Sequence, residues 1–201
     1  MAPGPQITGG IMKKQEAALP RKAALIIIDV QKGFDAPVWG RRNNPQAEDN
    51  IARLLEAWRR TKRPVIHVQH MSRNLQSPLR PGQAGNELKD AVKPAGREPI
   101  VQKCVNSSFI GTDLERRLRK HGIKTLVMTG INTNHCVSTT ARMAGNLGFE
   151  GFVVADATAT FDRRGHDGKL HRAEDMHAIG LAELHGEFAT VLETDDILRL
   201  L

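Results

Sequence analysis

Short apolar runs alternate along the chain with longer segments in which apolar residues recur every three or four positions. The first run, Ala23–Ile28, is rich in isoleucine, which is typical of a strand buried on both faces of a sheet. Between Ile51 and Trp58 the apolar residues follow the i, i+3, i+4, i+7 spacing of one helix face. The same patterns predict further strands over 65–68, 99–101, 125–128, 152–155 and 188–192, and further helices over about 113–121, 134–147 and 173–185.

Strands that alternate with helices predict one α/β domain. We expect a three-layer α/β/α sandwich with a mainly parallel, doubly wound sheet of about six strands. Residues 1–20 contain three prolines and no apolar periodicity, so we expect them to form a flexible amino-terminal arm, and residues 21–201 to form the domain. The segment 72–96 has little regular pattern, and loops of this length inside a compact domain are commonly functional.

Composition narrows the possible partners. The net charge of +7 raises the question of nucleic acid, but aromatic residues make up only 4% and tyrosine is absent, so a base-stacking surface is poorly supplied. No apolar run approaches the roughly 20 residues that span a bilayer. Two cysteines cannot build the disulfide framework of a small secreted protein. We therefore expect a cytoplasmic protein with a small-molecule substrate, no nucleic acid and no membrane partner.

Three reactive side chains follow the predicted strands. In open parallel sheets, ligands bind outside the carboxyl ends of the strands. Asp29 ends the first strand, Lys103 ends the third, and Cys136 lies in the loop and helix start after the fourth. Each has a structural explanation by itself, as a turn residue, a rim lysine or a buried thiol. Their shared position at three strand ends favours a common function.

This set of residues suits nucleophilic chemistry at a carbonyl group. A helix N-terminus and a nearby cation lower a cysteine pKa from about 8.5, so Cys136 is expected to be a thiolate beside Lys103. Asp29 can accept the thiol proton and later donate it to a leaving amine. Backbone N–H groups of the same helix start can bind an oxyanion. The predicted reaction is acyl transfer to water through a thioester.

Three motifs resemble the signatures of the isochorismatase-like cysteine hydrolases. They are Ile26–Gln31, Lys103 followed by Asn106–Phe109, and Gly130–Val137, and the resemblance covers residues 22–193. It implies an isochorismatase-like hydrolase fold that assembles as a homo-oligomer, a dimer or a larger form.

The resemblance also implies roles for individual residues. Asp29, Lys103 and Cys136 would be the catalytic triad. A cis peptide bond would join Ile131 to Asn132, and the backbone N–H groups of Asn132 and Cys136 would form the oxyanion hole.

Members of this family cleave different bonds, among them the vinyl ether of isochorismate, the amide of nicotinamide, and lactams. The nicotinamidase branch holds zinc through an Asp-x-His pair near the second strand, and this sequence has no such pair there; its Asp175-Met176-His177 lies in the helix predicted over 173–185. His67 and His70 are three apart on a strand, a spacing that points them to opposite faces. We therefore expect no metal and no cofactor, and a substrate that is an amide, lactam or imide, as in streptothricin hydrolase-like members.

Three alternatives stay open from the sequence. They are an isochorismatase, a zinc-dependent nicotinamidase-type amidase that uses Asp29 with His67 and His70, and a non-catalytic scaffold.

The sequence also suggests places for other residues near the motifs, one in the core and the rest in the substrate pocket. Cys104 is expected to point away from the site into the core. The residues expected to line the pocket are Phe34, Trp39, Asn106, Phe109 and Thr133.

Overall fold

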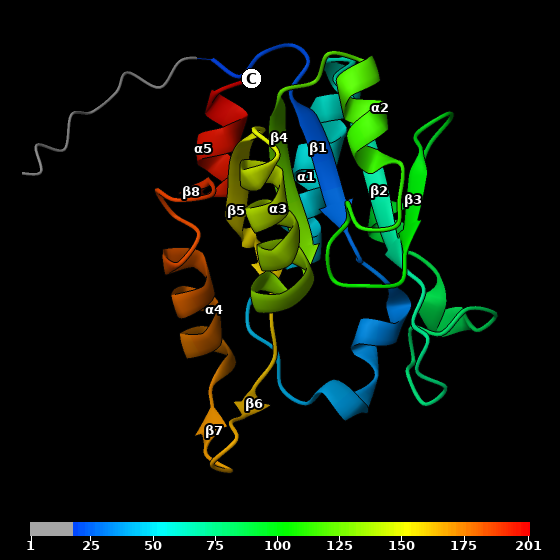
Figure 1. Cartoon of the computed structure of the whole chain (residues 1–201), viewed down its shortest axis with the longest axis vertical. Helices are drawn as coiled ribbons and strands as arrows, with labels where there is room; N and C mark the ends of the chain where they lie inside the picture. The colour runs from blue at the N-terminus through cyan, green and yellow to red at the C-terminus, as the bar shows by residue number, and fades with distance from the viewer. Residues whose placement is uncertain (1–17) are drawn as a thin grey trace, which may run out of the picture.

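The sheet has six strands, all parallel, in the order β3-β2-β1-β4-β5-β8 (Figure 1). These strands and all that follows come from a computed structural model, which describes residues 18–201. The strands are β1 (Ala24–Ile28), β2 (Val65–His70), β3 (Ile100–Lys103), β4 (Thr125–Ile131), β5 (Glu150–Ala159) and β8 (Thr190–Leu192). The chain runs outward from β1 to β3 and then returns to place β4 on the other side of β1. The strand order therefore reverses between β1 and β4.

Helices cover both faces of this sheet (Figure 1). On one face lie α1 (Ala47–Arg60) and α5 (Thr194–Arg199), and on the other lie α2 (Leu114–Lys120), α3 (Ser138–Asn146) and α4 (Ala173–Ala182). These layers confirm the predicted three-layer α/β/α fold.

The burial of strand β1 on both faces explains why its sequence is continuously apolar. All five of its residues are buried. Ile26 and Ile28 pack in the core beneath α2 and α3, whereas Leu25 and Ile27 pack in the core beneath α1. A strand covered by helices on both sides has no polar face, so the alternation typical of a half-exposed strand is lost.

Several elements differ from the predicted ones. Strand β5 is longer than expected, and its pairing with β4 is irregular between Met128 and Gly130. The helix expected from residue 134 begins as a π-helical turn, η5 (Thr133–Val137), before α3. The remaining short elements are the hairpin strands β6 (Arg163–Arg164) and β7 (Leu170–His171), and the 3-10 helices η1 (Lys32–Asp35), η2 (Pro37–Trp39), η3 (Ala84–Asn86) and η4 (Asp90–Val92).

The expected amino-terminal arm lies mostly outside the described residues, which begin at residue 18. Leu19, which the pattern placed in that arm, is buried, and its backbone N–H donates to the carbonyl of Leu200 at 2.7 Å. The chain is therefore already packed against the core at Leu19. In the described part of the chain, no helix is both long and apolar enough to cross a membrane.

Gly130 lets β4 approach β1 closely at the reversal of strand order. It pairs with Ile28 and has a φ of +128°. A Cβ atom there would lie 1.9 Å from the carbonyl oxygen of Ile28. The segment that carries Cys136 begins immediately after this contact, so Gly130 positions it.

We expect Gly130→Ala to destabilise the protein by more than about 3 kcal/mol, because both a backbone clash and an unfavourable φ are introduced. Gly148→Ala is the matched control: φ there is +79°, but no atom lies within 4 Å of the added Cβ. That variant should lose about 1–2 kcal/mol, the cost of a left-handed conformation for a residue with a Cβ. Urea unfolding curves measure both, and equal losses would contradict the importance of the close approach.

Candidate active site

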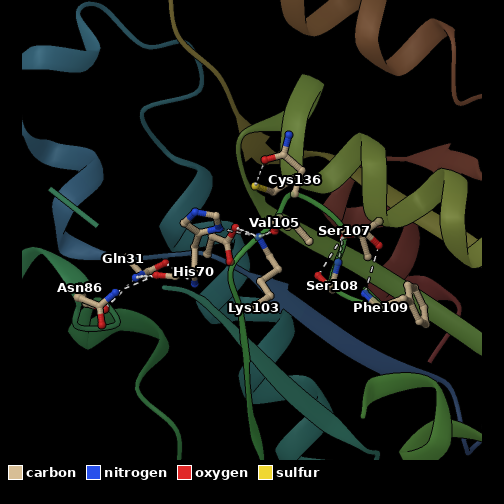
Figure 2. A network of polar contacts seen from close by, with 12 residues as sticks. Gln31, His70, Asn86, Lys103, Val105, Ser107, Ser108, Phe109 and Cys136 are labelled. Atoms are coloured by element: carbon tan, nitrogen blue, oxygen red, sulfur yellow. Dashed lines mark hydrogen bonds and ion pairs between the residues drawn. The ribbon is translucent and has the colours of Figure 1, made fainter. Parts of the chain in front are cut away.

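Four reactive side chains meet at the carboxyl edge of the sheet, around the reversal of strand order. Asp29 follows β1, His70 ends β2, Lys103 ends β3, and Cys136 lies in η5 after β4. Figure 2 shows His70, Lys103 and Cys136 close to one another. Because β3, β2, β1 and β4 are neighbours in this order, their ends bring the four groups together. This is where open parallel sheets bind ligands.

Lys103 and Asp29 form a fully buried ion pair. Lys103 Nζ lies 2.6 Å from Asp29 Oδ2, and both side chains are 0% exposed. Lys103 also donates to the carbonyl of Val105 at 3.1 Å and lies 3.2 Å from Nδ1 of His70. Burying either charge alone would be costly, so the two groups are retained only as a pair.

Cys136 faces this pair. Its Sγ, a carboxylate oxygen of Asp29 and a ring nitrogen of His70 all lie within 4.8 Å of one another. On its other side the thiol donates to Asn106 Oδ1 at 3.8 Å. The sulfur therefore has an acid, an imidazole and an amide around it.

The electrostatics of Cys136 differ from the sequence-based expectation. Burial raises the pKa of the Cys136 thiol above its ordinary value, and the negative charge of Asp29 raises it further, while Lys103 opposes both. The expected lowering was wrong because the charge of Lys103 is already matched by Asp29 and the sulfur is removed from water. Both effects favour the neutral thiol over the thiolate, so chemistry at this sulfur would need a base.

Asp29 offers a carboxylate oxygen near this thiol. Burial raises the pKa of its carboxyl group, and the adjacent Lys103 opposes this rise. Lys103 holds Oδ2, whereas Oδ1 has no hydrogen-bond partner among residues 18–201. One carboxylate oxygen is thus fixed by the ammonium group, and the other is available to the thiol proton.

A sharp turn presents Cys136. The Ile131–Asn132 peptide bond is cis, and the carbonyl of Asn132 accepts from the N–H groups of His135 at 3.2 Å and Val137 at 3.1 Å. Cys136 consequently lies in the first turn ahead of α3, where backbone N–H groups point toward the start of the helix.

A small cavity of about 100 Å³ opens onto the sulfur. Its apolar wall comes from Phe34 and Trp39, whose rings lie 5.1 Å apart, and from Leu79. Lysine and arginine are absent from the described residues that line it. The complete lining is Asp29, Phe34, Trp39, His70, Leu79, Asn106, Asn132, His135 and Cys136.

The structure brings most of the sequence-predicted residues to this cavity, but not all of them. Lys103 lies beneath the cavity and contacts Asp29 rather than the open space. Phe109 is buried in the core, stacked on Phe149 at a centroid distance of 5.8 Å. Thr133 is buried, and its hydroxyl lies 2.9 Å from Nδ1 of His177. Phe109 and Thr133 therefore do not line the pocket.

Sequence reasoning missed Leu79 and His135 as cavity residues, and it considered His70 only as a zinc ligand. The place of His70 at the cavity could have been predicted from the sequence, since His70 ends a strand next to the one that Asp29 follows. The place of Leu79 could not have been predicted, because this residue lies in the irregular 72–96 segment. That segment is attached to the end of β2 by Asn86, whose Nδ2 donates to the carbonyls of His70 at 2.8 Å and Leu79 at 2.7 Å.

Cys104 is exposed, so its predicted place in the core was wrong. Strand β3 is at the edge of the sheet, and its residues alternate between buried and exposed. Lys103 takes the buried side, which leaves the next residue facing solvent. The two cysteines thus differ sharply in accessibility.

The donors proposed for a zinc site do not come together. His67 is buried farther down β2, and its Nε2 lies 2.8 Å from Glu98. The remaining donors, Asp29 and His70, both contact the ammonium group of Lys103, which takes the position of a cation between them. The residues present therefore do not fit a zinc ion held by Asp29, His67 and His70.

A larger cavity of about 900 Å³ lies at the opposite edge of the sheet, beside Pro64, Pro99 and Ile123. None of the four reactive groups lines it. Several cations around it, such as Arg59 and Arg117, stand in the last turns of α1 and α2, where positive side chains complement the helix dipole.

The fold and the site together define an α/β protein with a buried acid–lysine pair beside a cysteine at the strand ends. The isochorismatase domain matches residues 23–196. The chain is 49% identical over 181 residues to the isochorismatase family protein YrdC of Bacillus subtilis, a match that covers 90% of this chain and 97% of YrdC.

Solved structures agree with this match. A member of the isochorismatase family from Chromobacterium violaceum has a TM-score of 0.88 and 43% identity, covering 92% of this chain and 97% of that one. A cysteine hydrolase from Pseudomonas syringae has a TM-score of 0.83 and 26% identity, covering 94% and 98%. The protein belongs to the isochorismatase family and is a hydrolase.

We expect Asp29→Asn to increase the reactivity of Cys136 toward iodoacetamide at pH 7. The variant removes the negative charge that raises the pKa of the thiol and leaves Lys103 in place, so the thiolate fraction grows about tenfold for each unit by which the pKa falls. Mass spectrometry of the Cys136 peptide measures the alkylation rate.

The Cys104 peptide serves as the internal reference, because that thiol is exposed. Asp35→Asn, which changes an acid on the neighbouring loop outside the ion pair, is the matched control and should leave the rate unchanged. A slower reaction in Asp29→Asn would mean that Asp29 stabilises a thiolate rather than a thiol.

Proposed function

We propose that the protein is a cysteine amidohydrolase that cleaves the C–N bond of a small, uncharged amide, lactam or imide. The observation that supports this most strongly is the free carboxylate oxygen of Asp29 beside the neutral thiol of Cys136. The nitrogen of an amide leaves as a neutral amine only if it receives a proton. A carboxylate that takes the thiol proton and then donates it to this nitrogen therefore suits an amide substrate.

In the proposed acylation step, Cys136 Sγ attacks the carbonyl carbon while its proton passes to Asp29. The carbonyl π electrons move to oxygen, which the backbone N–H groups of Asn132 and Cys136 would stabilise. When the tetrahedral intermediate collapses, the C–N bond breaks and the proton on Asp29 moves to the departing nitrogen. The products are a thioester on Cys136 and a free amine.

In the proposed deacylation step, water replaces the thiol as the nucleophile and Cys136 becomes the leaving group. Asp29, again a carboxylate, takes a proton from water as the oxygen attacks the thioester carbonyl. The C–S bond then breaks, and that proton returns to the sulfur. The net reaction is R–CO–NHR′ + H2O → R–COOH + R′NH2, and Lys103 offsets the charge of Asp29 throughout.

The cavity favours a small acyl group without charge. A cavity of about 150 Å³ holds benzene in other proteins, so about 100 Å³ suits a group of only a few heavy atoms before any loop movement. Phe34 and Trp39 offer a flat apolar wall. Because no lysine or arginine among the described residues lines the space, a substrate with two carboxylates, such as isochorismate, would lose its hydration without gaining a partner.

A panel of small primary amides, lactams and imides, screened for ammonia release or ring opening, tests this function. We expect Cys136→Ala to lower kcat at least about a thousandfold on any substrate found, because the covalent route is lost. Cys104→Ser is the matched control and should retain full activity, since that thiol is exposed and outside the site.

Dialysis against a chelator should also leave the rate unchanged, because the proposed steps use only side chains and water. Full activity in Cys136→Ala, or loss of activity that added zinc restores, would contradict the cysteine mechanism.

The pH dependence of kcat/KM should have an acidic limb set by Asp29. Only the carboxylate form accepts the thiol proton, and burial raises the pKa of this group above 3.8. Activity should therefore disappear as the pH falls through that raised value, and it should be complete above it. Stopped assays across the acidic range measure the limb. A profile that stays flat down to pH 3.8 would contradict the role of Asp29.

A further inference from the structure

His70 is a cavity residue that the proposed steps do not use. It ends β2 and is half-buried at the wall of the cavity beside Cys136. Its backbone is firmly held: its N–H donates to Gln31 Oε1 at 2.9 Å, and its carbonyl accepts from Gln31 Nε2 at 3.1 Å and from Asn86 Nδ2 at 2.8 Å (Figure 2). The imidazole is therefore presented from a fixed point.

Lys103 determines which ring nitrogen of His70 carries the proton. The ammonium group has three protons and three acceptors around it: Asp29 Oδ2, the carbonyl of Val105, and His70 Nδ1 at 3.2 Å. An ammonium group can only donate, so Nδ1 must be the acceptor in this contact. In a neutral imidazole the proton then lies on Nε2.

The charged form of His70 is disfavoured by the same neighbours. Burial lowers the pKa of His70, and the positive charge of Lys103 lowers it further, while Asp29 opposes them. Nε2 has no hydrogen-bond partner among residues 18–201, and it does not belong to the polar atoms that are shut off from solvent. His70 thus offers one accessible, uncharged donor at the cavity.

We propose that His70 is a substrate-binding residue, fixed by Lys103 as the Nε2–H tautomer, that donates a hydrogen bond to an acceptor on the acyl part of the substrate. This rests on the proposed function, in which backbone N–H groups already bind the scissile carbonyl oxygen. The substrate therefore carries a second acceptor, such as another carbonyl oxygen, close to the bond that is cleaved.

Nitrogen-15 NMR of histidine-labelled protein tests the tautomer without any substrate. The His70 signals, assigned by their absence in His70→Gln, should show a protonated Nε2 and a bare Nδ1 at neutral pH, with no conversion to imidazolium near pH 6.5. In Lys103→Met the constraint is gone, and the ring should titrate closer to 6.5. A protonated Nδ1 in the unaltered protein would overturn the proposal.

A probe attached to Cys136 tests the donor role. In a Cys104→Ser background, iodoacetamide places a carboxamidomethyl group with a carbonyl acceptor in the cavity, with loss of iodide and the thiol proton. Methyl methanethiosulfonate places a methylthio group without such an acceptor, with loss of methanesulfinate and the thiol proton. The Nε2 proton should move downfield only with the carboxamidomethyl group, and an equal shift with both groups would overturn the proposal.

Once a substrate is found, two variants separate binding from structure. His70→Leu removes the donor and should lower kcat/KM about tenfold, as expected for one lost hydrogen bond. His70→Gln carries an amide N–H at a similar reach and should recover most of that loss. Equal losses of kcat/KM in the two variants would overturn the donor role. A failed substrate search would count only against the proposed function, because the two NMR experiments test the role of His70 without a substrate.

Discussion

The pairing of Lys103 with Asp29, two opposite charges with no exposed surface, constrains everything else at this site. Each charge offsets the cost of burying the other, since an unpaired ion in the interior costs several kcal/mol. The pair joins the ends of β1 and β3, with β2 between them. The same ammonium group also contacts His70 Nδ1, so the cation that neutralises the acid sets the tautomer of the imidazole.

The pair also helps to explain why the pKa of the Cys136 thiol is raised. A cation that is already matched by a carboxylate has little attraction left for a thiolate, so burial dominates the pKa of Cys136. In the proposed mechanism, activation requires a proton acceptor at the moment of attack, and the unpartnered oxygen of Asp29 would serve as that acceptor. A neutral, buried thiol reacts more slowly with oxidants and alkylating agents than an exposed thiol such as Cys104 does.

Patterns in the sequence were enough to predict the layers of the fold and that Asp29, Lys103 and Cys136 lie at neighbouring strand ends, because strand ends and helix starts follow from apolar periodicity. The pocket was only partly predictable. Phe109 turned into the core and Thr133 toward His177, and neither direction is encoded by spacing along the chain. The pKa of Cys136 was predicted in the wrong direction because burial and the prior pairing of Lys103 are properties of the assembled structure.

The protonation state of Cys136 in the resting protein most directly tests whether Asp29 acts as the base. Infrared difference spectra of Cys104→Ser against the Cys104→Ser/Cys136→Ala double variant isolate the S–H stretching band of the one remaining thiol. We expect a distinct S–H band at pH 7, shifted by a hydrogen bond, that persists well above the ordinary cysteine pKa of about 8.5. Absence of the band at pH 7 would show a resting thiolate, which needs no base, and would contradict the role of Asp29 as the acceptor of the thiol proton.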